Sequence, residues 1–208
     1  MWGRQLFVLF IILLSGASQL RAAELVSRSV GAVGKEVVTS RYVLMNSLIE
    51  DELYRRGKAR GLMKLDIKSR LFMQETTAVL IELAISRESK SFPIAQVQES
   101  EVKSQMQKFS KRMKGSSAWK KLGVTSEELK LILSRKLMSK KFIKFKVDSA
   151  SLPVSDMEAE EYFKKNRFKF EKYGFEKFKK NIKSFLNKRR VYSRLKEWFL
   201  FLQINYNI

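Results

Sequence analysis

Apolar side chains recur every three or four residues along most of the chain, and this spacing predicts a series of amphipathic helices. The expected helices cover residues 41–56, 67–88, 97–113, 126–151, 156–166 and 175–202, with one helical turn at 118–122. The last of these has the most regular apolar stripe, and Lys and Arg fill its other face. The pattern therefore predicts a mainly α fold.

Two of the helix starts share a capping signal. Thr125 stands three residues before Glu128, and Ser155 stands three residues before Glu158. In such a capping box the hydroxyl accepts from the backbone amide of the glutamate, whose carboxylate accepts from the amide of the capping residue. Glu158 and its acidic neighbours are thus interpreted as groups that stabilise a helix start, not as catalytic acids.

The two ends of the folded region are predicted to be extended. Short β-branched runs flank Gly34 and Lys35, which indicates a β-hairpin over residues 29–39 with glycine first in the turn. Residues 203–208 alternate polar and apolar side chains, which predicts a C-terminal strand. We expect this strand to pair with the hairpin, tie the last helix to the amino-terminal body and make one domain.

The first 22 residues have the pattern of a secretory signal peptide, with Arg4, an apolar run at 6–14 and small residues up to Ala22. The run is shorter than the ~20 residues that a spanning helix needs. We expect cleavage after Ala22 or Ala17 and a single domain over 23–208, with no transmembrane segment after removal of the signal. A buried core helix and an uncleaved anchor remain alternatives. Because the chain has no cysteine, neither a lipoprotein anchor nor disulfides are expected, and the periplasm is the simplest location.

The amino-acid composition limits the kinds of catalytic and metal site that the chain can form. The 208 residues include 42 Lys and Arg, 21 Asp and Glu and no histidine or cysteine, for a net charge of +21. These absences exclude a Ser-His-Asp triad, a cysteine nucleophile and a Cys/His zinc site. We therefore expect a non-enzyme with no catalytic residues, no metal and no cofactor; an enzyme acting through carboxylates alone is the alternative, but no spacing supports it. For an exported chain, the charge indicates anionic surfaces or acidic polypeptides as partners and not a specific nucleic acid.

The order of elements resembles the chaperone module of the SurA family of periplasmic folding factors. The similarity lies in the export signal, in the strings VGAVGKEVVTSR (30–41), TSEELKLILSRKLMSKKFIK (125–144) and VSDMEAEEYFKKN (154–166), and more loosely in the last helix and strand. It implies a multi-helix chaperone module that binds unfolded or nascent envelope proteins. Only residues 167–174 separate the third string from the last helix, and there is no histidine. The resemblance thus implies a client-binding body without the parvulin isomerase domains.

Flexible methionine surfaces suit the binding of varied apolar segments. The residues predicted to bind clients are Met45, Leu48, Met63, Met106, Phe109, Met113 and Trp119. Buried packing is the alternative explanation for each of the methionines. The expected function is that of an ATP-independent periplasmic chaperone that assists outer-membrane protein assembly through an apolar cleft. An exported basic protein that binds anionic polymers or membrane surfaces, and a dedicated scaffold partner, are the alternatives.

Overall fold

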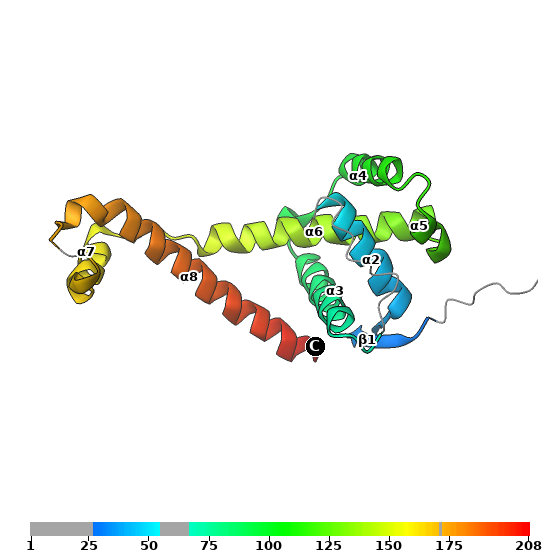
Figure 1. Ribbon diagram of the computed structural model, residues 1–208, viewed down its shortest axis with the longest axis horizontal. Helices are drawn as coiled ribbons and strands as arrows, with labels where there is room; N and C mark the ends of the chain where they lie inside the picture. Colours follow the sequence, from blue (N-terminus) through cyan, green and yellow to red (C-terminus); the bar gives the residue numbers. More distant parts are fainter. Residues whose placement is uncertain (1–26, 55–66, 171) are drawn as a thin grey trace, which may run out of the picture.

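The computed structural model describes residues 27–54, 67–170 and 172–208, and these are mainly helical (Figure 1). An antiparallel hairpin, β1 (Ser29–Val33) and β2 (Glu36–Thr39), comes first. The helices are α2 (Ser40–Leu53), α3 (Arg70–Ser89), α4 (Glu99–Arg112), α5 (Ser117–Leu122), α6 (Ser126–Ala150), α7 (Asp156–Lys165) and α8 (Phe175–Tyr206), with short 3-10 turns η2 (Pro93–Ala95) and η3 (Arg167–Lys169). The prediction of a mainly helical fold with an N-terminal hairpin is confirmed. As expected for the turn, Gly34 has a positive φ of 60°.

Helices α2 to α6 and the hairpin form a body with two adjoining apolar clusters. The first lies between α2, α4, α5 and α6 and includes Ile49, Phe109 and Leu133, all fully buried. The second joins the hairpin to α2 and α3 and contains Val33 and Val79. Helix α6 contributes to the first cluster and continues beyond the body (Figure 1). It therefore also contacts α8.

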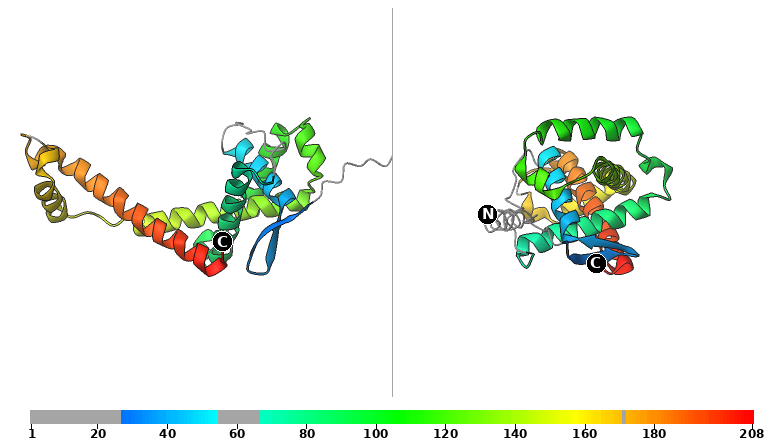
Figure 2. Two further views of the ribbon diagram at one scale, coloured as in Figure 1. Left: turned by 60° about the horizontal axis from the view of Figure 1, so that its bottom comes forward. Right: turned by 90° about the vertical axis from the view of Figure 1, so that its right-hand side faces the viewer.

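Helices α7 and α8 form a limb that extends from the body. The chain turns at the far end of the limb, where Ala159 and Phe163 of α7 pack against Ile182 of α8. Helix α8 then runs back, crosses α6 and ends beside α3 (Figures 1 and 2). The limb therefore has a small apolar core of its own, and α8 connects that core to the body.

The predicted strand over residues 203–208 is wrong. Helix α8 continues to Tyr206, and Asn207 ends it in the left-handed conformation with φ of 54°. An alternating run this short also fits the last turns of a helix, where Leu202 and Tyr206 lie on one face. Tyr206 donates a hydrogen bond to Glu88 of α3 at 2.7 Å, and Ile208 packs, like Val30 of β1, against the second cluster. The two ends of the described chain thus meet through side chains, with no strand pairing.

Some predictions fall outside the described residues. They are the signal peptide at 1–22, the last two residues of the helix predicted at 41–56, and Met63.

Both capping boxes are present, and the one at α6 also holds α2 in place. Thr125 Oγ1 accepts from the Glu128 amide at 3.1 Å, and the Glu128 carboxylate accepts from the Thr125 amide at 2.9 Å. The Arg41 guanidinium makes two hydrogen bonds to that carboxylate, at 2.5 and 2.9 Å, and a third to the Leu122 carbonyl at 2.9 Å. The Arg41 hydrogen bonds, together with those to Thr125, lower the pKa of Glu128 to about 2.

We expect Glu128→Gln to lower the free energy of unfolding by roughly 1–2 kcal/mol at pH 7, because it removes charge-assisted hydrogen bonds. The ionised Glu128 stabilises the folded state above the ordinary carboxyl pKa of 4.5, and this stabilisation is lost as the pH falls toward 2. Urea unfolding across this range should therefore show the two proteins converging in acid. Glu127→Gln, at the exposed neighbouring position, is the matched control. An equal loss in both variants would contradict this role.

Candidate functional site

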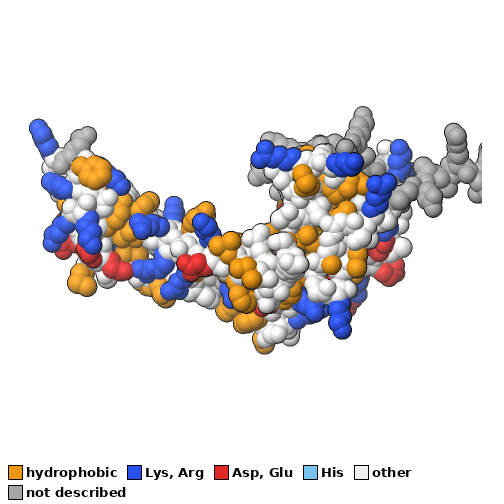
Figure 3. Space-filling model, turned by 90° about the horizontal axis from the view of Figure 1, so that it is seen from below, with side chains coloured by type: hydrophobic (Ala, Val, Ile, Leu, Met, Phe, Trp, Pro, Cys, Tyr) orange, Lys and Arg blue, Asp and Glu red, His pale blue; other side chains and the backbone are white. Residues whose placement is uncertain are grey.

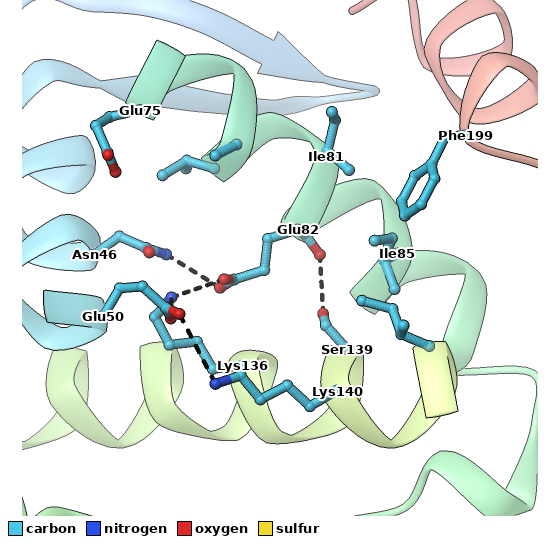
Figure 4. A pocket seen from close by; sticks show the side chains of 13 residues that line it. Asn46, Glu50, Glu75, Ile81, Glu82, Ile85, Lys136, Ser139, Lys140 and Phe199 are labelled. Carbon is cyan, nitrogen blue, oxygen red and sulfur yellow. Dashed lines mark hydrogen bonds and ion pairs between the residues drawn. The ribbon is translucent and has the colours of Figure 1, made fainter. Parts of the chain in front are cut away.

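A cleft of about 380 Å³ lies between α2, α3, α6 and α8 (Figure 4). Its lining consists of Asn46, Glu50, Glu75, Ala78, Val79, Ile81, Glu82, Ile85, Lys136, Ser139, Lys140, Ile143 and Phe199. The four helices come from distant parts of the sequence, so the cleft exists only in the folded chain. The lining residues divide into an apolar wall and a polar floor.

Branched aliphatic side chains and one aromatic ring form the wall. Ile81 and Ile85 lie one turn apart on α3, on the flank of the stripe that packs into the body. Ile143 of α6 and Phe199 of α8 complete the wall (Figure 4). Ile81, Ile143 and Phe199 are only partly buried, so an apolar ligand would gain contact area with each of them.

A buried lysine joins three helices at the floor. The side chain of Lys136 on α6 is 1% exposed, and its Nζ lies 2.7 Å from Glu82 of α3 and 2.9 Å from Glu50 of α2. Asn46 donates to the second oxygen of Glu82 at 3.1 Å. Burial by itself lowers the pKa of Lys136, but the two carboxylates outweigh it, and the pKa is raised. The lysine therefore stays charged and paired.

Lys140 lies one turn further along α6, at the edge of the cleft. Its side chain is 42% exposed, its Nζ is 3.9 Å from Glu50, and the Tyr54 ring centroid is 2.7 Å away. Desolvation lowers the pKa of Lys140 to about 8, with a further contribution from the charge of Lys136, and Glu50 opposes both. The edge of the cleft thus has an amine whose charge changes within a mildly alkaline range.

Six of the residues predicted to bind clients lie within the described ranges, and these are brought together away from this cleft. Met45, Leu48 and Phe109 are buried in the first cluster of the body, and Met106, Met113 and Trp119 pack against the same cluster. Phe109 and Trp119 meet edge to face at 4.7 Å. The apolar surface of the three buried side chains is already used in the core, and client binding by the other three stays a prediction.

The residues that do line the cleft are not among those predicted from the sequence, although the sequence contains one signal for them. Lys136 follows Ile132 and Leu133 at the spacing of one helix face, and Ile143 continues that face. A cation in the middle of an apolar face requires a buried carboxylate partner or a cavity. The pattern identifies the position, but the partners on α2 and α3 are known only from the fold.

Neither a metal site in the described residues nor a relative assigns a function to the cleft. Within the described ranges, no group of three acidic side chains is placed to hold a metal ion, and no helix has the length and apolar character needed to cross a membrane. No protein-family model matches the chain, and searches of curated proteins and of solved structures give no match either.

The Lys140 amine is expected to titrate with a midpoint near pH 8, which NMR of the lysine side chains can measure. Lys140→Met assigns the signal by removing it. In Glu50→Gln the midpoint should fall further, because Glu50 raises the pKa of this amine. Since the folded-state pKa lies below the ordinary value of 10.5, Lys140 should make unfolding less favourable as the pH rises from about 8 to about 10.5. A midpoint near 10.5 would contradict the placement of Lys140.

Proposed function

We propose that the protein is an ATP-independent chaperone that binds segments of unfolded or unassembled envelope proteins in the cleft between α2, α3, α6 and α8. The observation that supports this proposal best is the partly open apolar wall of Ile81, Ile143 and Phe199 above a charged floor. Binding and release involve no covalent step. The resemblance to the SurA chaperone module and the signal-like N-terminus agree with action in the periplasm.

The size of the cleft suits one or two client side chains. Its volume of about 380 Å³ lies at the small end of the range for ligand pockets. An aromatic side chain buries about 150–250 Å², which contributes roughly 4–6 kcal/mol at 25 cal/mol per Å². The cost of association removes much of this gain. Affinity in the micromolar range, about −8 kcal/mol, therefore needs contacts beyond one ring, and it allows release without an energy source.

The polar edge of the cleft can bind the backbone of a client. Lys140 supplies a donor and Glu50 an acceptor beside the apolar wall. An extended segment would place one apolar side chain on the wall and its peptide groups at this edge. Such contacts recognise no particular sequence, which suits a binder of many unfolded chains. The net charge of +21 would favour encounters with acidic clients at low salt.

Ile81→Gln and Ile143→Gln should each weaken suppression of the aggregation of an unfolded outer-membrane protein. The loss of one branched apolar contact corresponds to a roughly tenfold higher chaperone concentration for half suppression. Light scattering during dilution of the client from urea measures this concentration. Leu131→Gln, at a 49% exposed position of α6 outside the cleft, is the matched control.

Phe199→Ala provides a second test, because it changes the wall from α8 and leaves α3 and α6 intact. Unfolding curves establish that each variant is folded at the assay temperature. The proposal is contradicted if the parent protein fails to slow aggregation at large excess, or if Leu131→Gln impairs suppression as much as the cleft variants do.

A further inference from the structure

One face of α8 is exposed and alternates apolar with basic side chains. Its members are Phe185, Arg189, Tyr192, Lys196, Leu200 and Ile204, separated by steps of three or four residues and thus on one side of the helix. All six are exposed, with Tyr192 at 70% and Ile204 at 81%. At 1.5 Å per residue this outer face of α8 is about 28 Å long. None of its residues lines the cleft.

The charge of α8 is strongly one-sided. Its nine cations are Lys177, Lys179, Lys180, Lys183, Lys188, Arg189, Arg190, Arg194 and Lys196, and its two acids are Glu176 and Glu197. Carboxylates of α7 pair with three of the cations, Lys179, Lys183 and Arg190. In the described part of the chain, Arg189 and Lys196 have no ion-pair partner. Figure 3 shows hydrophobic and basic side chains interspersed along the limb.

We propose that the outer face of α8 docks on an anionic phospholipid surface. A helix lying at the membrane interface places apolar side chains at the boundary between headgroups and acyl chains and extends Lys and Arg toward the phosphates. The outer face of α8 has both kinds of group along one line. Rings such as Tyr192 suit the headgroup level, and Leu200 and Ile204 supply the aliphatic contact near the helix end.

The alternation of groups disfavours a partner helix as the occupant. A helix–helix seam needs continuous apolar positions, with charges at its edges. Here Arg189 and Lys196 lie between the apolar residues, so a protein partner would have to desolvate both cations or supply two matched acids. A lipid surface provides phosphate groups beside every ring without such matching. This inference goes beyond the proposed chaperone function and does not depend on the cleft.

The test uses a fluorescent reporter in the full chain, which has no cysteine, so that one introduced cysteine labels one site. Ser193→Cys places an environment-sensitive NBD dye four residues after Arg189 and three before Lys196. Ser110→Cys on α4 is the matched control, because both serines are exposed and α4 lies across the body from α8 (Figure 1). The probes are vesicles of phosphatidylcholine with and without phosphatidylglycerol.

We expect a blue shift at position 193 on phosphatidylglycerol vesicles, weaker in high salt, and little change at position 110. Adding Arg189→Gln and Lys196→Gln should raise the lipid concentration for half the shift by roughly thirtyfold. Lys103→Gln with Lys108→Gln removes the same charge from α4 and should have a much smaller effect. All variants have the same amino-terminal residues, so their differences report on the substituted face.

Four results would overturn the proposal. They are no shift at position 193 on anionic vesicles, an equal shift on neutral vesicles, an equal effect of the α4 charge variant, and a shift at position 193 produced by an acidic helical peptide but not by vesicles. The last result would assign the face to a protein partner. The result of the aggregation assay on the cleft variants does not depend on any of these four outcomes.

Discussion

The position of Lys136 between Glu50 and Glu82 determines how the body is assembled. Each of the three side chains comes from a different helix, and the two carboxylates approach one another because the ammonium group lies between them. Removal of one member of a buried pair costs about 3–5 kcal/mol. This is a large fraction of the 5–15 kcal/mol that a typical domain has in total. Polar contacts thus join α2, α3 and α6 where other parts of the body use apolar packing, and beside them the interior is left unfilled as the cleft.

The same helix that completes the cleft also has the exposed basic face. Phe199 of α8 belongs to the wall, whereas Tyr192, two turns earlier on the same side of the helix, does not line the cleft and is exposed. The contacts of Leu202 and Tyr206 with the body hold this end of α8 in place, and so bring Phe199 to the cleft while Tyr192 lies further along the limb.

Much of the fold could be predicted from the sequence because its signals are local. The helical spacing, the glycine turn of the hairpin and the capping boxes at Thr125 and Ser155 each depend on residues a few positions apart. The C-terminal strand was mispredicted because the alternation of a few residues fits two structures. The contact between Tyr206 and Glu88, 118 residues apart, favours the helix, and local sequence contains no information about it.

The candidate site was harder to predict, because apolar spacing alone does not distinguish a packed core from an open wall. Met45 and Phe109 follow the same periodicity as Ile81 and Ile143, yet the first two are buried and the last two face the cleft. Whether an apolar residue is buried or faces the cleft depends on which helices pack over it: α4 and α5 cover one surface of the body, and α8 lies over the other. The signal for the cleft in the sequence was Lys136, a cation on an otherwise apolar helix face.

Photo-crosslinking from position 199 tests the central claim most directly. Benzoylphenylalanine can replace Phe199 in the cleft wall and, as the matched position on the outer face of α8, Tyr192. With an unfolded outer-membrane protein and no lipid present, the account predicts crosslinks from position 199 to apolar, aromatic-rich client segments and few from position 192. Equal crosslinking from both positions, or none from position 199, would contradict it.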